Sequence, residues 1–142
     1  IEKPMTEFKT QTGRIAAPAC RVFEVLSDWN QLEKIKEKIP ESKLRGLEFD
    51  ADSCRFVIDS YGVGEIALCI SERNPCSVIK IKAEQSPIDF NAIISIEEEN
   101  PEVCLMTIGL EAALPFMLKH ILSPSIQTGL DKILNLLTEY SY

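Results

Sequence analysis

Apolar and polar residues alternate along most of the chain after Pro40, and this alternation predicts a series of β-strands. The clearest case is Ser77–Glu84, where Ile79 and Ile81 alternate with charged residues. The six strands predicted in this region cover residues 43–50, 53–59, 65–71, 77–84, 88–98 and 103–111. Turns are expected at 50–52, 61–64, 73–75, 86–87 and 97–101. Because these turns are short, neighbouring strands should pair antiparallel, with one apolar face buried and one polar face in water.

The first forty residues predict a different order of elements. A looser alternation over Glu7–Ile15 predicts one strand. Pro18 then suits the first turn of a helix, where a missing N–H costs nothing. The helical spacing of the apolar residues after it predicts a short helix with the stripe Val22, Phe23, Leu26 and Trp29. A second short stripe, which ends at Pro40, predicts another helix from Leu32, Ile35 and Ile39.

The last segment predicts a long amphipathic helix that opens at Pro115. Its apolar residues step by four, three, four and three positions through Ile126, Leu130, Ile133, Leu137 and Tyr140. Such a stripe needs an apolar partner, and the apolar face of the sheet supplies one. Pro124 should kink or restart this helix, because proline removes a hydrogen-bond donor and crowds the preceding turn.

The predicted order is a strand, two short helices, six strands and a long helix. This order and the segment "IAAPACRVFEVLSDWNQLEKI" at residues 15–35 resemble the helix-grip fold of the START-like superfamily, also called SRPBCC. That superfamily includes polyketide cyclases, lipid-transfer domains and pollen-allergen-like proteins. The resemblance implies an α+β helix-grip fold: a curved seven-stranded antiparallel sheet with two short helices after strand 1 and a long C-terminal helix. An NTF2-like cone is the alternative, but it begins with helices and ends on strands.

We expect a single START-like domain over residues 6–142, with residues 1–5 as a tag remnant or a disordered start. A curved sheet cannot meet a straight helix everywhere, so a cavity is expected between them. The residues predicted to line it are Phe56, Ile58, Ile66, Leu68, Ile79, Ile81, Phe90, Ile94, Met106, Ile108, Met117, Ile121 and Ile126. The same residues would also form a closely packed core with no ligand space. The sequence leaves both alternatives open.

Composition and charge narrow the classes of partner. The chain has 142 residues, 45% of them hydrophobic and 26% charged, with a formal net charge of −7. This acidic surface disfavours nucleic acid, whose binding depends on clustered Lys and Arg. No stretch approaches the ~18 apolar residues of a membrane span, so we expect no stable membrane insertion. We expect a cytoplasmic protein that is a monomer or a weak homodimer.

The five cysteines do not indicate a disulfide framework, because their number is odd and they are scattered. Three of them, Cys54, Cys69 and Cys104, lie in apolar strand patterns, where a thiol behaves as a small hydrophobic group. This interpretation fits a reducing cytoplasm.

The sequence offers little for catalysis, and we expect no cofactor. His120 is the only histidine, with no carboxylate one helical turn away, so a surface position is favoured over a catalytic one. No spacing fits zinc or a calcium loop, and the acidic run Glu97–Glu99 is interpreted as a solvated turn. A cavity could still hold a polar group from Arg14, Asp59, Tyr61, Glu65 or Glu111. Alternation directs Glu65 and Glu111 away from the apolar face.

The predicted function is therefore binding or transport of a small hydrophobic or amphipathic ligand. The ligand class follows from the resemblance, and the residues supply only an apolar lining. Two alternatives stay open: a cyclase or hydratase of the same superfamily, which would need an acid–base group in the cavity, and a co-chaperone-like protein-interaction module.

Overall fold

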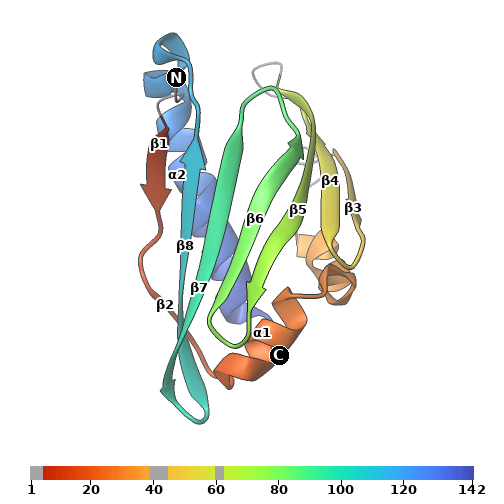
Figure 1. Ribbon diagram of the computed structural model, residues 1–142, viewed down its shortest axis with the longest axis vertical. Coiled ribbons are helices and arrows are strands. Elements are labelled where there is room, and N and C mark those ends of the chain that lie inside the picture. Colours follow the sequence, from red (N-terminus) through yellow and green to blue (C-terminus); the bar gives the residue numbers. More distant parts are fainter. Residues whose placement is uncertain (1–4, 39–44, 60–62) are drawn as a thin grey trace.

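The strands form one curved antiparallel sheet, and a long helix crosses its concave face (Figure 1). This computed structural model describes residues 5–38, 45–59 and 63–142. Its strands are β1 Thr6–Lys9, β2 Gly13–Ile15, β3 Arg45–Phe49, β4 Ser53–Ile58, β5 Gly64–Asn74, β6 Val78–Gln85, β7 Phe90–Asn100 and β8 Val103–Ala112. Its helices are α1 Ala19–Leu26, the 3-10 helix η1 Trp29–Lys38 and α2 Phe116–Glu139. The predicted α+β helix-grip architecture is confirmed.

The strand order explains why two short helices follow the first strand. The order across the sheet is β1-β8-β7-β6-β5-β4-β3, and β2 also pairs with β8. The N-terminal strands therefore lie at one edge and β3 at the other. α1 and η1 carry the chain between these edges at one end of the sheet (Figure 1). The buried residues of this connection are Ala19, Val22, Val25, Leu26, Trp29 and Leu32.

The predicted strand over Glu7–Ile15 is divided into β1 and β2. Lys9, the last residue of β1, pairs with Gly109, and Gly13, the first residue of β2, pairs with Met106. The chain advances four positions between these pairs on the N-terminal side but only three on β8, so one extra residue interrupts the ladder. The Thr10 hydroxyl accepts the backbone N–H of Ile108 at 3.0 Å. This side-chain bond satisfies a backbone donor at the interruption, where a buried unpaired N–H would be costly.

β5 is longer than predicted, and β7 has the predicted length but begins and ends two residues later. Arg73 and Asn74 were expected in a turn but are the last residues of β5. Residues 99–100 were expected only in a turn but end β7. These strand ends are exposed and polar, so the alternation of polarity stops before the backbone pairing does. The predictions that involve residues 39–40, 43–44 and 61–62 lie outside the described residues.

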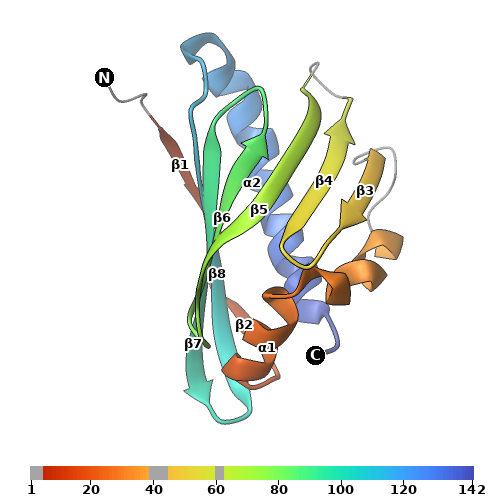
Figure 2. The same cartoon turned by 45° about the vertical axis from the view of Figure 1, so that its right-hand side comes forward.

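α2 lies along the concave face of the sheet (Figure 2). It continues through Pro124 instead of restarting there. The carbonyl that Pro124 leaves without a helical donor belongs to exposed His120, so water can satisfy it. Gly13 permits close approach of β2 to α2, because a Cβ at this position would lie 2.6 Å from Thr138 Cγ2. Among the described residues, no helix has the length and hydropathy of a membrane span.

A disulfide joins Cys20 in α1 to Cys76 in the turn between β5 and β6, with 4.4 Å between their Cα atoms. The expectation that the cysteines form no disulfide is therefore wrong for this pair. The two residues are 56 positions apart, and they meet only because α1 packs at the end of the β5–β6 hairpin. Disulfides are typical of oxidising compartments, so the cysteines no longer support a cytoplasmic location.

Candidate functional site

Most of the strand residues predicted to line a cavity share the concave face of the sheet. The strand register places them opposite one another in rows across neighbouring strands. One row contains Ile81, Ala92 and Leu110, and the next row toward α1 contains Ile79, Ile94 and Ile108. Because successive residues of a strand point to opposite faces, the residues between these positions face outward. The sheet therefore presents a continuous apolar surface to α2.

Packing is tight at the end of this surface that α1 covers. Ile79, Cys104 and Met106 have no exposed surface there, and neither does Val22 of α1. Trp29 completes this region with an exposed fraction of only 5%. Such complete burial indicates a closed core with normal side-chain packing. This half of the concave face leaves no surface for a ligand to contact.

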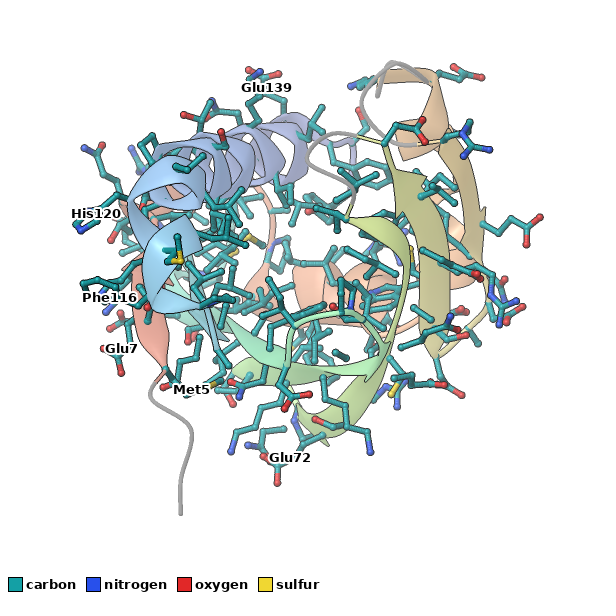
Figure 3. The ribbon with its side chains drawn as sticks, turned by 90° about the horizontal axis from the view of Figure 1, so that it is seen from above. Met5, Glu7, Glu72, Phe116, His120 and Glu139 are labelled. Carbon is teal, nitrogen blue, oxygen red and sulfur yellow. A yellow bond between two sulfur atoms is a disulfide. The ribbon has the colours of Figure 1, made fainter. Side chains whose placement is uncertain are left out.

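Packing is looser toward the end where α2 begins. Several apolar side chains on the inner surfaces are only half-buried there, although others remain buried: Phe8, Ile66, Ala112, Leu114 and Leu122. The half-buried residues are Phe56, Ile58, Leu68, Phe90, Ala92, Leu110 and Ile126. Figure 3 looks down on this end and shows side chains of the sheet and of α2 directed toward a common interior. Solvent therefore reaches apolar groups of this inner surface.

The predicted lining residues thus fall into three groups. The buried ones are Ile66, Ile79, Ile81, Ile94, Met106 and Ile108. The half-buried ones are Phe56, Ile58, Leu68, Phe90 and Ile126. Met117 and Ile121 are exposed, with fractions of 85% and 54%. The participation of all three groups in ligand binding stays a prediction.

Sequence reasoning omitted residues that the structure places at this surface. Ala92 and Leu110 follow the same strand alternation as the predicted lining residues, so the same pattern indicates that they face inward. The inner side of α2 runs in steps of four through Leu122, Ile126, Leu130 and Leu134. The predicted stripe contained Ile126 and Leu130 but then passed to Ile133, so it missed Leu134. The signal was present, because a step of four also keeps residues on one helix face.

The described part of the concave face holds no acid–base pair. Among the described residues, Thr10 is the only buried polar or charged one, and its hydroxyl is bonded to Ile108. Glu65 is exposed, and Glu111 lies on the outer face opposite Glu7. His120 is exposed and makes an edge-on contact with Phe116, with ring centroids 6.5 Å apart. Tyr61 lies outside the described residues.

The other polar candidates form surface ion pairs. Arg14 contacts Glu99 at 3.0 Å, and Arg45 contacts Asp59 at 3.1 Å. The hydrogen bond from Arg45 lowers the pKa of the Asp59 carboxyl below its usual value. No group of three or more metal-ligating side chains occurs within the described ranges. The electrostatics of these residues therefore support a surface role rather than a reaction centre.

Two tyrosines close the tightly packed end. The Tyr140 hydroxyl donates to the carbonyl of Gln31 at 2.6 Å, and the Tyr142 hydroxyl donates to the carbonyl of Leu137 at 2.7 Å. Burial raises the pKa of Tyr142, and burial also raises the pKa of the Cys104 thiol. These contacts hold the residues after α2 against η1 and against α2 itself.

A shallow hollow of about 150 Å³ lies on the outer face of the sheet, where Gly109 has no side chain. It is open to solvent and is bordered by residues of β1, β7 and β8: Glu7, Phe8, Lys9, Asn91, Ile93, Gly109, Leu110 and Glu111. Leu110 also belongs to the half-buried inner surface. Its polar rim does not match the predicted apolar lining.

Solved structures with the same fold include plant and bacterial proteins. Norcoclaurine synthase from Thalictrum flavum, in complex with dopamine and hydroxybenzaldehyde, is 14% identical, with a TM-score of 0.72 over 98% of this chain and 90% of that chain. A START superfamily protein from Mycobacterium smegmatis is 16% identical, with a TM-score of 0.60 over 94% of this chain and 99% of that one. A protein from Thermus thermophilus is 17% identical, with a TM-score of 0.67 over 94% of this chain and 95% of that one.

No protein-family model matches the sequence, and no curated protein matches it significantly. The structural similarity nevertheless extends over nearly the whole chain. The protein therefore has the START-like helix-grip fold. Because these identities are below one fifth, the comparisons establish the fold and not a shared activity.

Proposed function

We propose that this protein binds a small apolar or amphipathic molecule between the concave face of its sheet and α2. The observation that carries the proposal is the change in packing along one continuous apolar surface. Ile79 and Met106 are fully buried at one end, whereas Phe90, Ala92 and Leu110 are half-buried at the other. A folded chain gains stability by burying such groups, so solvent-reached apolar groups on an inner surface favour a ligand-binding role.

The binding energy would come mainly from burial of ligand surface. Removing ~200 Å² of apolar surface from water contributes about 5 kcal/mol before the costs of ordering the ligand. The norcoclaurine synthase complex with dopamine and hydroxybenzaldehyde shows that this fold holds small aromatic molecules in another protein. Phe56 and Phe90 offer aromatic contacts for a ligand of this size here.

The residues in the described part of the site support ligand binding better than catalysis. An enzyme of this fold would need a positioned acid, base or nucleophile facing the ligand. The one buried polar side chain among the described residues, Thr10, is engaged by a backbone N–H. The cytoplasmic location and the monomeric or weakly dimeric state stay predictions.

A pair of adjacent substitutions tests the proposed site. Ala92 faces inward between Ile81 and Leu110, whereas Ile93 faces outward and is 38% exposed. We expect Ala92→Trp to weaken binding of the neutral fluorophore N-phenyl-1-naphthylamine by about tenfold or more, because the indole occupies the ligand's space. Ile93→Trp adds the same group on the other face and should leave binding unchanged.

The measurement is a fluorescence titration, with the thermal midpoint of each variant recorded by circular dichroism. Equal affinity in the wild type and Ala92→Trp, with both proteins folded, would show that the fluorophore binds elsewhere. Loss of binding only in Ile93→Trp would move the site to the outer face of the sheet.

A further inference from the structure

The first turns of α2 expose four large apolar side chains, which we call the apolar tip: Phe116, Met117, Leu118 and Ile121. Their exposed fractions are 83%, 85%, 40% and 54%, in that order. Figure 3 looks down on this end of the molecule and shows Phe116 and His120 pointing outward on the side of β1. No described element covers the apolar tip.

The arrangement of apolar residues along α2 explains the exposure of Met117 and Ile121. Beyond Pro124, the buried residues Leu130, Leu134 and Leu137 lie on the side of the helix that meets the sheet. At 100° per residue, Met117 and Ile121 project from the side away from these leucines. They therefore contribute little to the core, and among the residues of the first two turns only Leu122 is buried.

The apolar tip is large for an exposed surface. Large side chains of this kind each offer on the order of 200 Å², so these fractions leave roughly 500 Å² of apolar surface in water. The largest apolar patch on a typical monomer covers about 300–600 Å² and is often functional, so the tip has the size of a candidate interaction site. A stable dimer buries about 800 Å² on each partner, which exceeds what the tip provides.

The charges around the apolar tip favour an anionic partner. Residues 112–130 contain no Asp or Glu, although the chain has 22 acidic residues. Lys119 and His120 lie within the tip and are exposed. The N-terminus of a long helix adds a partial positive charge. Three acids among the described residues oppose this attraction: Glu7 of β1, which Figure 3 shows on the same side, Glu111, which pairs with it, and Asp89, whose carbonyl accepts the N–H of Ala113.

We propose that the apolar tip docks reversibly on the surface of an anionic lipid bilayer. Phe116, Met117 and Ile121 enter the boundary between headgroups and acyl chains, while Lys119 stays at the level of the phosphates. Apolar groups beside basic ones are the features by which amphipathic helices bind such surfaces. The tip lies at the end of the molecule where the inner surface is half-buried. This inference goes beyond the proposed function, because docking itself needs no bound ligand.

Co-sedimentation with lipid vesicles tests the proposal. We expect wild-type protein to sediment with vesicles of phosphatidylcholine mixed with phosphatidylserine and to bind phosphatidylcholine vesicles more weakly. Phe116→Ser combined with Met117→Ser should lower the partition coefficient at least about tenfold, because two side chains no longer leave water. Ile93→Ser, which removes an exposed apolar group from the outer sheet face, is the matched control and should change nothing.

Lys119→Gln and added salt should each weaken binding to the mixed vesicles, because both reduce the electrostatic attraction. Equal binding to the two kinds of vesicle would overturn the anionic assignment. Failure of the wild type to sediment, or full binding by the double variant, would overturn the docking proposal. The docking proposal would also be overturned if the wild type did not bind vesicles but formed a concentration-dependent dimer that the double variant abolishes. Fluorophore uptake by the double variant should stay normal, which separates this test from that of the ligand site.

Discussion

At the residue scale, burial has different consequences at the two ends of the concave face. Ile79 and Met106 make the α1 end solid, and Tyr142 is held against it through a hydrogen bond to Leu137. Ala92 and Leu110 belong to the same apolar surface but are only half-buried. The alternation of residues predicts which side chains face inward. It contains no information on how completely each is covered, because coverage depends on distant segments.

Tyr142 makes stability sensitive to alkaline pH. Its pKa is raised above the usual 10.0, mainly by burial, so the fold favours the neutral phenol. This contribution is complete below about pH 10 and is lost above it, because the unfolded chain then releases a proton that the folded protein keeps. We expect the free energy of unfolding to fall with pH above that value, as measured by urea titration with Trp29 fluorescence.

Tyr142→Phe removes the ionisable group and keeps the ring, so its stability should fall less steeply over the same pH range. A wild type and a variant with parallel pH profiles would show that Tyr142 ionises normally in the folded protein.

At the element scale, the order and type of most elements follow from sequence patterns. The strict alternation of residues 77–84 corresponds to β6, and the stripe after Pro18 corresponds to α1. The division of the first strand was missed, because Thr10 replaces a ladder bond with its side chain and leaves no break in polarity. The disulfide was also missed, because a separation of 56 residues gives no local signal.

The Cys20–Cys76 disulfide should stabilise the packing of α1 against the β5–β6 turn. Closing a loop of this length restricts the unfolded chain, and the chain-entropy model gives about 4 kcal/mol, near the upper end of typical measured values. We expect Cys20→Ser combined with Cys76→Ser to lower the free energy of unfolding by about 2–4 kcal/mol.

Urea titrations of both proteins with and without dithiothreitol provide the measurement and its control. The reductant should destabilise the wild type and leave the double variant unchanged. A wild type that the reductant does not affect would show that the disulfide contributes nothing to stability in solution.

At the scale of the whole molecule, the fold was predictable and the interior space was not. The order of elements identified the helix-grip arrangement, which solved structures of similar shape confirm. The volume between sheet and helix depends on how side chains from many strands and α2 fit together, and no sequence pattern encodes that sum. The exposure of Met117 and Ile121 illustrates this limit, because the helix carries both as its pattern indicates yet turns them away from the sheet.

The most direct test of the central claim locates a bound ligand by nuclear magnetic resonance. Isotope-edited spectra of methyl-labelled protein with N-phenyl-1-naphthylamine detect contacts between ligand protons and individual methyl groups. We predict nuclear Overhauser effects to Ile81, Leu110 and Ile126, and none to outward-facing Ile93. Contacts confined to Ile93 or to Ile121 of the apolar tip, or no contacts at all, would contradict a ligand site between the sheet and α2.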